Sequence, residues 1–418
     1  MPKPPNILFV FADQLSARWL PCCGGDKVRT PNLDRFAAES VNFTRAYTCS
    51  PLCSPYRASL LTGLYPTRHG VVENGLRLPA DAPTLADALN GAGYATHYIG
   101  KWHLGGPPGG NHWVPPQKRG GFQHFIGWES HHVDHWDGLV WADDPDAPIE
   151  LEGHETNGLT NLVCRELEGV DETPFCMLVS YQAPHPPCSP PDTFRSLYRG
   201  EALTDEPNAD GDARFHRPAW DEDCGIRDFR ERYFAETTHL DHAVGRILDA
   251  LDRLGLASNT VVVFTSDHGE MAGAHGLFGK GVMYEEAVHV PLLVRMPGQA
   301  RGRRVETPVS TVDLLPTVLE LAGAQPVEAA EGRSLAAVLR GAGALEERPV
   351  FIEYHDHCVV DGANKLIAEP DGKPVALYDL QADPWELDNR VDEPRERNRV
   401  DRLLGELQQW RSRMGPRV

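Results

Sequence analysis

Strand patterns that alternate with helical patterns constrain the fold of this chain more than any other feature. Residues 6–12 form an apolar run that ends at Asp13, as expected for a strand buried on both faces. The same pattern recurs at residues 175–180 and 261–265, and residues 228–254 have the periodicity of a long amphipathic helix. Strands alternating with helices predict an α/β fold around a large, mostly parallel sheet that is sandwiched by helices.

Four further segments extend this pattern. A helix is predicted over residues 84–92, with Thr84 as its N-cap, and a strand over residues 94–99. Residues 290–295 predict another strand and residues 310–322 another helix. The alternation therefore continues through most of the chain.

Two segments interrupt the alternation. Residues 105–121 are rich in Gly and Pro and are predicted to form a loop. Residues 187–225 are polar, charged and rich in Pro, which predicts a long surface excursion. The chain contains no internal repeat and no low-complexity tract.

The pattern changes towards the end of the chain. Residues 348–353 and 373–378 predict strands of a smaller sheet, and a polar helix is predicted over residues 393–413. We therefore expect a large α/β domain over residues 1–344, which would carry the functional site, and a smaller C-terminal α+β subdomain over residues 345–418.

Composition limits the classes of partner. The chain has 418 residues, a hydrophobic fraction of 41% and a formal net charge of −20, so it can build a sizeable core. The acidic balance argues against nucleic acid as a partner and requires a local positive site for any anionic ligand. Without a long apolar run or an apolar leader, we expect no membrane partner and no signal peptide. Nine cysteines without framework spacing favour a cytoplasmic location, and the oligomeric state stays open.

Four predicted strands end next to charged or metal-capable side chains. In chain order, these residues are Asp13 and Gln14, Lys101 and His103, His185, and Asp267 and His268. A single Asp after a strand is most often a helix cap. Sites in open parallel sheets form beyond the carboxyl ends of the strands, however, and four occupied ends point to such a site.

A dense motif surrounds Cys53. The sequence reads Cys53-Ser-Pro55-Tyr-Arg57 and continues to Thr62-Gly63. Pro55 fits the first turn of a helix, which would place Cys53 just before a helix N-terminus, where free N–H groups favour an anion. A lone cysteine beside a turn is more often a buried structural thiol, but the complete spacing reverses that preference.

This motif resembles the signature of the type I sulfatases, which belong to the alkaline phosphatase superfamily. The segment Gly100-Lys-Trp-His-Leu-Gly105 is similar to a second motif of that family. The resemblance implies an alkaline-phosphatase-like fold and conversion of Cys53 to formylglycine by a dedicated modifying machinery. The hydrate of that aldehyde, bound to a metal, would attack a small anionic substrate, a sulfate monoester of a small polar alcohol such as a sugar.

The resemblance also implies a ligand set and a catalytic set. A single divalent metal ion would be held by Asp13, Gln14, Cys53, Asp267 and His268. Mainly oxygen ligands favour Ca²⁺, whereas the histidine nitrogen keeps Mn²⁺ open, and Mg²⁺ is a further candidate. Many family members have Asp and Asn where this chain has Gln14 and His268. The implied catalytic residues are Cys53, Arg57, Lys101, His103, His185 and Lys280.

Two alternative functions remain. A phosphonate monoester hydrolase or phosphodiesterase of the same superfamily would use the same nucleophile, and some of these relatives have the Gln14 and His268 pattern. The segment from Gly100 to Gly105 favours the sulfatase. A metal-binding protein without turnover would keep Cys53 as a thiol, and the complete set of site residues argues against it.

Histidine-rich segments elsewhere are weaker candidates. Residues 128–136 hold His131, His132 and His135 and look like a second metal cluster, but their spacing matches no zinc motif that we can identify. A loop that lines the substrate cleft, or simple surface, is the preferred interpretation. His355 and His357 lie in the C-terminal region and could equally close over the site or be structural.

Overall fold

An eight-stranded, mostly parallel sheet forms the centre of the protein. The computed structural model describes residues 3–107, 110–130, 134–201, 203, 205–209, 225–299 and 301–414. In sheet order the strands are β12 (Arg303–Val305), β2 (Val41–Phe43), β11 (Leu292–Arg295), β9 (Thr260–Ser266), β1 (Asn6–Asp13), β8 (Phe175–Pro184), β4 (Ala95–Lys101) and β5 (His124–Trp128). From β9 to β5 all neighbouring strands are parallel, and β11 is antiparallel to β9 and β2. The predicted α/β class is confirmed.

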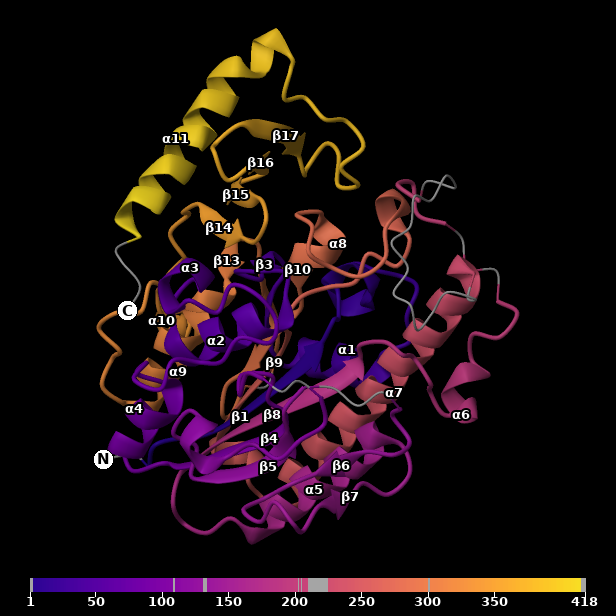
Figure 1. Cartoon of the computed structure of the whole chain (residues 1–418), viewed down its shortest axis with the longest axis vertical. Helices are drawn as coiled ribbons and strands as arrows, with labels where there is room; N and C mark the ends of the chain where they lie inside the picture. Colours follow the sequence, from indigo (N-terminus) through magenta and orange to yellow (C-terminus); the bar gives the residue numbers. More distant parts are fainter. Residues whose placement is uncertain are drawn as a thin grey trace.

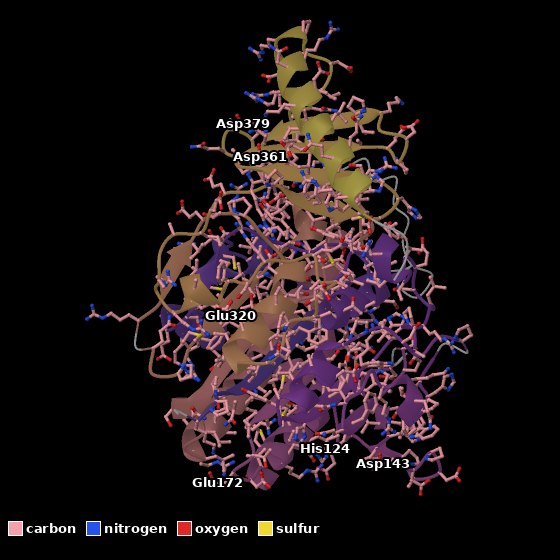
Figure 2. All side chains as sticks on the ribbon, turned by 90° about the vertical axis from the view of Figure 1, so that its left-hand side faces the viewer. His124, Asp143, Glu172, Glu320, Asp361 and Asp379 are labelled. Carbon is pink, nitrogen blue, oxygen red and sulfur yellow. The ribbon has the colours of Figure 1, made fainter. Side chains whose placement is uncertain are left out.

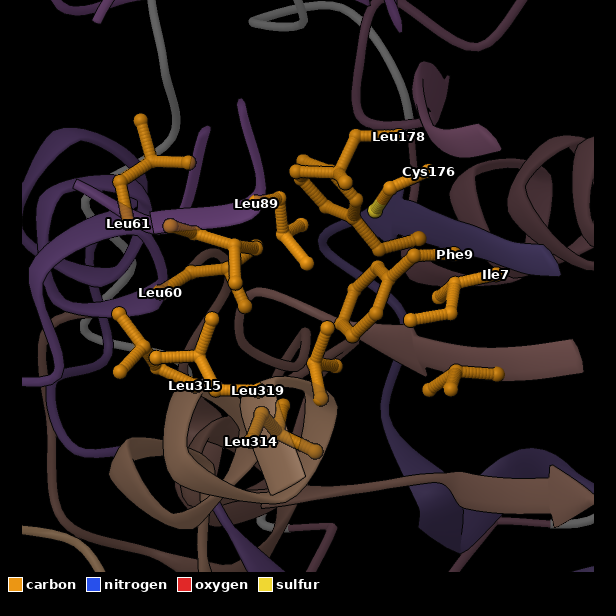
Figure 3. Close-up of a cluster of buried hydrophobic side chains, with 14 of the residues drawn as sticks. Ile7, Phe9, Leu60, Leu61, Leu89, Cys176, Leu178, Leu314, Leu315 and Leu319 are labelled. Carbon is orange, nitrogen blue, oxygen red and sulfur yellow. The ribbon is translucent and has the colours of Figure 1, made fainter. Parts of the chain in front are cut away.

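Strand β1 separates two hydrophobic cores because its side chains alternate between the faces of the sheet. Ile7, Phe9 and Phe11 point into one core, and Leu8 and Val10 into the other. Figure 3 shows the first core, where the strand side chains face leucines of the covering helices. The continuously apolar sequence of β1 thus reflects burial on both faces.

Helices cover both faces of the sheet (Figure 1). One layer contains α2 (Cys53–Thr62), α4 (Leu85–Gly91) and α9 (Leu314–Ala322), and the other contains α1 (Pro31–Ala38), α5 (Glu155–Gly169) and α7 (Ile226–Arg253). The helix predicted over residues 228–254 corresponds to α7. Thr84 caps α4 as predicted, in a reciprocal pair of hydrogen bonds with Asp87.

Short elements connect these layers. They are β3 (Ala46–Tyr47), α3 (Pro66–His69), β6 (Leu139–Val140), β7 (Ile149–Glu150), α6 (Asp192–Arg195), α8 (Glu285–Val288), β10 (His289–Val290), β13 (Val309–Ser310) and α10 (Ala336–Leu339). The prediction of one strand over residues 290–295 was wrong in one respect. Pro291 divides this segment, because β10 pairs with β3 in a second sheet whereas β11 joins the main sheet. Much of the excursion predicted over residues 187–225 lies outside the described residues.

A four-stranded antiparallel sheet and the last helix form the C-terminal part, at the top of Figure 1. The sheet contains β14 (Val350–Glu353), β15 (His357–Asp361), β16 (Asn364–Ala368) and β17 (Pro374–Asp379), and α11 spans Arg397–Arg413. The two predicted strands are its outer strands β14 and β17. Trp410 of α11 stacks on Phe351, with ring centroids 4.8 Å apart.

Much of the negative charge lies on the outer surface. Figure 2 labels Asp143 and Glu172 at the end of the molecule opposite α11, and their side chains are almost fully exposed. Of the lysines of the candidate site, by contrast, Lys101 is buried and Lys280 is partly buried. Among the described residues, none of the helices has the length and apolar character needed to cross a bilayer.

Leu315 of α9 provides a test of the first core. This side chain is fully buried and lies among the leucines of the covering helices in Figure 3. Leu315→Ala should lower the free energy of unfolding by about 2–5 kcal/mol, because it removes apolar contacts and leaves a cavity. Leu387→Ala is the control, since Leu387 is 58% exposed, and urea denaturation should show a change below about 0.5 kcal/mol. Equal effects of the two substitutions would contradict the packing described here.

Candidate active site

Four adjacent parallel strands bring the predicted site residues to one edge of the sheet. Asp13 ends β1, Lys101 ends β4, and Asp267 directly follows β9. His185 directly follows β8, which lies between β1 and β4. Because these strands are parallel, their carboxyl ends lie on the same side, as expected for a site in an open α/β sheet.

Cys53 is the first residue of α2 rather than the residue before it. Its Sγ atom lies 3.2 Å from His268 Nε2, 3.3 Å from Lys280 Nζ and 3.6 Å from Asp13 Oδ1. Burial and Asp13 raise the pKa of the thiol, but Lys280, Lys101 and His268 outweigh them and lower it to about 6. The environment therefore favours an anionic or nucleophilic group at this position.

Asp13 is fully buried and pairs with two buried cations. Its Oδ2 atom accepts hydrogen bonds from Lys101 Nζ at 2.6 Å and from Arg57 Nη2 at 3.0 Å. Burial alone would raise the pKa of Asp13, but Lys101 and its other cationic neighbours hold it well below the usual value. Asp13 is therefore ionised.

Arg57 also connects three elements of the fold. Its Nη1 atom donates to the carbonyl oxygen of Lys101 and to Ser180 Oγ, both at 2.7 Å. These contacts join α2 to β4 and β8. A lysine at position 57 could not reproduce this planar set of donors.

Asp267 and His268 face Cys53 from the end of β9. The Asp267 Oδ1 atom accepts hydrogen bonds from the backbone N–H groups of Gln14 and His268, at 2.9 and 2.8 Å. Burial, followed by repulsion from Asp13, raises the pKa of Asp267 to about 6. The His268 Nδ1 atom lies 3.0 Å from the Gly269 carbonyl oxygen, to which only a protonated nitrogen can donate, so Nε2 is left as the ligand atom in neutral imidazole.

The arrangement of these groups fits a divalent cation. Asp13, Cys53, Asp267 and His268 are buried and offer ligand atoms that all lie within 4.8 Å of one another. Two carboxylates close together repel each other, as the raised pKa of Asp267 reflects. Within the described residues, Asp267 Oδ2 accepts no hydrogen bond, and its nearest cation is Arg57 Nη2 at 3.6 Å. A cation between these groups would remove the repulsion and satisfy that oxygen.

Gln14 lies beside this cluster, and its side chain contacts Lys280 and Glu270. The amide oxygen accepts a hydrogen bond from Lys280 Nζ, and the amide nitrogen donates to the Glu270 carboxylate. Glu270 was missed by the sequence analysis, although it follows His268 by only two residues. It also accepts the N–H groups of Ala272 and Gly279, so it orients Gln14 and the loop that leads to Lys280.

His103, His185 and Lys280 complete the site. Burial is the main reason that the pKa of each histidine lies well below its usual value, and nearby lysines lower it further. Both imidazoles are therefore neutral and can accept a proton. Burial also lowers the pKa of Lys280, but Cys53 and Asp13 outweigh it, so the pKa is raised and the ammonium stays charged.

The backbone near His103 is held by residues that the sequence analysis did not select. The His103 N–H donates to the carbonyl oxygen of Glu129, and the His103 carbonyl oxygen accepts a hydrogen bond from Ser54 Oγ at 2.7 Å. Glu129 directly follows β5, so β5 is a fifth strand whose carboxyl end carries a residue near the site. The signal was missed because no strand had been predicted over β5.

The other histidine clusters lie in different surroundings. His131 and His132 lie outside the described residues, whereas His135 is fully buried and joins a second cluster that is described below. His355 Nε2 lies 3.9 Å from Glu73, and Tyr354 donates a hydrogen bond to the same carboxylate at 3.1 Å. Since a Cβ atom at Gly281, next to Lys280, would lie 3.2 Å from the Tyr354 ring, the loop after β14 approaches the site.

Sequence models of known families match nearly the whole chain. The model described as Sulfatase covers residues 5–324. A second, described as N-sulphoglucosamine sulphohydrolase, C-terminal, covers residues 273–413. An ulvan-active sulfatase from Formosa agariphila is 32% identical over 414 residues, which cover 94% of this chain and 78% of that protein.

Solved structures show the same similarity. A protein in complex with its substrate D-glucosamine-2-N,6-O-disulfate superposes with a TM-score of 0.86 at 25% identity, covering 99% of this chain and 98% of that one. A phosphonate monoester hydrolase from Agrobacterium radiobacter has a TM-score of 0.80 at 26% identity, covering 98% and 96%. The fold is therefore shared by enzymes that act on sulfur and on phosphorus esters.

Asp267→Asn tests the ligand cluster. Loss of the carboxylate charge should weaken binding of a divalent ion by more than the roughly 10–100-fold typical of outer-shell partners. Metal content after gel filtration should fall, while Asp249→Asn should leave it unchanged, because Asp249 is exposed and pairs with Arg35. Equal metal content in the two variants would show that Asp267 is not a ligand.

The acidity of the Cys53 thiol gives a second test, on metal-free protein in which Cys53 is unmodified. Thiolate absorbance, taken as the difference from Cys53→Ala, should appear as the pH rises through about 6, because the pKa is lowered. Lys280→Met removes a cation 3.3 Å from the sulfur and should move this transition to higher pH. Lys373→Met, at an exposed lysine, should not. A transition near the usual thiol value of about 8.5 in the parent protein would contradict the electrostatics.

Proposed function

Because this chain belongs to the sulfatase family and is a sulfuric ester hydrolase, we propose that it hydrolyses the sulfate monoester of a small polar alcohol, with a sugar sulfate as the substrate class. We further propose that the nucleophile derives from Cys53 by conversion to formylglycine. The observation that carries both proposals is the position of Cys53 Sγ, within 3.6 Å of His268, Lys280 and Asp13.

The charges around Cys53 suit an anionic ester. A sulfate monoester repels anionic nucleophiles, so cations must offset its charge. Lys280 contacts the Cys53 sulfur, and Lys101 and Arg57 form ion pairs with Asp13. When present, the divalent ion and the aldehyde hydrate of residue 53 would supply Lewis acidity and the attacking oxygen.

The remaining residues handle protons and charge. Lys280 stays charged and can stabilise negative charge that develops on the leaving oxygen. His103 is neutral, and within the described residues its buried Nδ1 atom has no hydrogen-bond partner, so it can take a proton from the group at position 53. We assign His185 to contact with the sulfate, because its charge interactions are with Lys280, Asp13 and Lys101.

Calcium is our first choice for the ion, with Mn²⁺ and Mg²⁺ as alternatives. Asp13, Asp267 and a residue-53 hydroxyl would supply oxygen ligands, which favour a hard cation. His268 supplies a nitrogen, which a transition ion accepts more readily. The side chain of Gln14 would have to release Lys280 to join the ligands.

The sugar sulfate proposal is supported by two relatives. One is described as an ulvan-active sulfatase, and another was solved with a sulfated glucosamine. A phosphonate monoester hydrolase is the second candidate, because such an enzyme has the same fold. It is the less favoured candidate because the segment from Gly100 to Gly105 is similar to a sulfatase motif. A cytoplasmic location remains part of the proposal.

Modification of Cys53 can be measured directly. Protein made together with a formylglycine-generating enzyme should yield a residue-53 peptide with the mass of the aldehyde, and should hydrolyse an aryl sulfate. Protein made without that enzyme should carry the thiol and be slower by several orders of magnitude, because the thiol cannot provide the hydrate oxygen. Cys358→Ala, at a buried cysteine of the C-terminal sheet, is the matched control. Full activity of the Cys53→Ala variant would contradict the proposal.

Substrate class is tested with matched leaving groups. Values of kcat/KM for an aryl sulfate, an aryl phosphonate monoester and an aryl phosphodiester should be highest for the sulfate. Lys280→Ala should reduce the sulfate rate by on the order of 10²–10³, as expected when one charge-stabilising donor is lost. A clear preference for either phosphorus ester would favour the second candidate instead.

A further inference from the structure

A second cluster of histidine and carboxylate side chains is buried away from Cys53. It contains His135, in the loop before β6, His154, the N-cap residue of α5, and Glu236 and His239 of α7. All four side chains are almost completely inaccessible to solvent. His135, His154 and Glu236 offer ligand atoms that lie within 4.8 Å of one another. We propose that this cluster is a structural site for a zinc-like divalent cation.

The spacing of the atoms matches one shared ion. The Glu236 Oε1 atom lies 3.4 Å from His154 Nε2 and 3.6 Å from His239 Nδ1. These separations are long for hydrogen bonds. With zinc–ligand bonds of about 2.0–2.1 Å, two ligands of a tetrahedral ion lie about 3.3–3.4 Å apart. Both separations from Glu236 are close to those that a bound ion would set, and His239, which lies outside the group of three mutually close ligands, would have to move slightly to become a fourth.

Glu236 has the character of a carboxylate that lacks its cation. Both of its oxygens are buried, and neither accepts a hydrogen bond of acceptable geometry from the described residues. An ionised carboxylate left in this state would be strongly destabilising. The imidazoles of His154 and His239 lie 3.4 and 3.6 Å from its Oε1 atom, at positions from which they could share a cation with it.

The tautomer of His239 points to the same ion. Its Nε2 atom lies 3.1 Å from Asn157 Oδ1, and an amide oxygen only accepts, so Nε2 carries the proton. With the proton on Nε2, a neutral ring turns the lone pair of Nδ1 towards Glu236 Oε1, which lies 3.6 Å away. Two electron-rich atoms face each other unless a cation lies between them. A carbonyl partner on the far nitrogen is the usual outer contact of a metal-binding histidine.

His154 makes one contact that competes with the ion. Its Nδ1 atom accepts the Thr156 N–H at 3.2 Å, whereas ligation through Nε2 would place the ring proton on Nδ1. The hydrogen bond from the Thr156 N–H to His154 Nδ1 would therefore be lost when the ion binds. The rival arrangement is a metal-free ion pair of protonated His154 with Glu236, since Glu236 raises the pKa of His154 against the effect of burial.

Three imidazoles and one carboxylate select the metal class. Nitrogen-rich sites favour zinc and related transition ions over Ca²⁺ or Mg²⁺. Four protein ligands leave no open position, which is typical of structural rather than catalytic zinc. Glu236 and His239 are three residues apart on α7 and therefore share one face of the helix.

The site would stabilise the chain on both sides of His185. His135 contacts Gln182 of β8 through Nε2 at 3.1 Å. The neighbouring Trp136 packs edge-on against His154, with ring centroids 5.2 Å apart, and donates a hydrogen bond to the Ser189 carbonyl oxygen at 3.0 Å. An ion bound here would fix the residues that contact Gln182 and Ser189 against α5 and α7.

Zinc binding tests the proposal directly. Chelator-treated protein in a Cys53→Ala background, which removes the thiol of the first cluster, is titrated with Zn²⁺ and analysed for metal after gel filtration. We expect about one tightly bound zinc ion per chain, a higher thermal midpoint, and an anomalous diffraction peak at the zinc edge between His135, His154 and Glu236.

Glu236→Gln and His239→Gln should each abolish this zinc uptake and the rise in thermal midpoint. His242→Gln is the matched control, because His242 lies on the same helix and is exposed. Failure of the parent protein to retain zinc, or a zinc peak at another position, would overturn the proposal and favour the His154–Glu236 ion pair. These two measurements use the parent protein of the test alone, so they do not require the Glu236 or His239 variants to fold. They are also independent of sulfate hydrolysis.

Discussion

Two buried cations hold the carboxylate of Asp13 at the carboxyl end of β1, and much of the site depends on this contact. Lys101 and Arg57 both bind the same oxygen, Oδ2. Removing one partner of such a buried pair usually destabilises a protein by about 3–5 kcal/mol, because the other charge is left uncompensated. Arg57 also binds β4 and β8 through Lys101 and Ser180, so the contact that fixes the charge also fixes α2 against the sheet.

This charge balance explains how an acidic protein can bind an anion. The chain carries a net charge of −20, with Asp143 and Glu172 among the exposed groups. Lys280 is partly buried beside Cys53, where a dielectric below that of bulk water strengthens its interaction with a bound ester. The exposed carboxylates therefore act on a bound ester from a distance and through solvent. Lys280 acts on it at close range, so its positive charge determines whether the anion binds.

The fold, and the convergence of the candidate site residues at one edge of the sheet, could be predicted because their signals are local. The apolar run of β1 and the polar residues after each strand can be recognised from a few neighbouring positions. The parallel arrangement of the strands then brings the polar residues together at one edge of the sheet. Three features were not predictable in this way. Glu270 acts through Gln14, the strands β15 and β16 carry no strong alternation, and His135 meets Glu236 only through tertiary packing.

A crystal structure of the modified, metal-loaded protein with bound sulfate would test the account most directly. The account predicts one ion held by Asp13, Asp267, His268 and the residue at position 53. It also predicts that Lys280 and His185 contact the sulfate oxygens, while Lys101 and Arg57 remain on Asp13. An ion bound away from Asp13 and Asp267, or a sulfate bound away from Lys280, would contradict it.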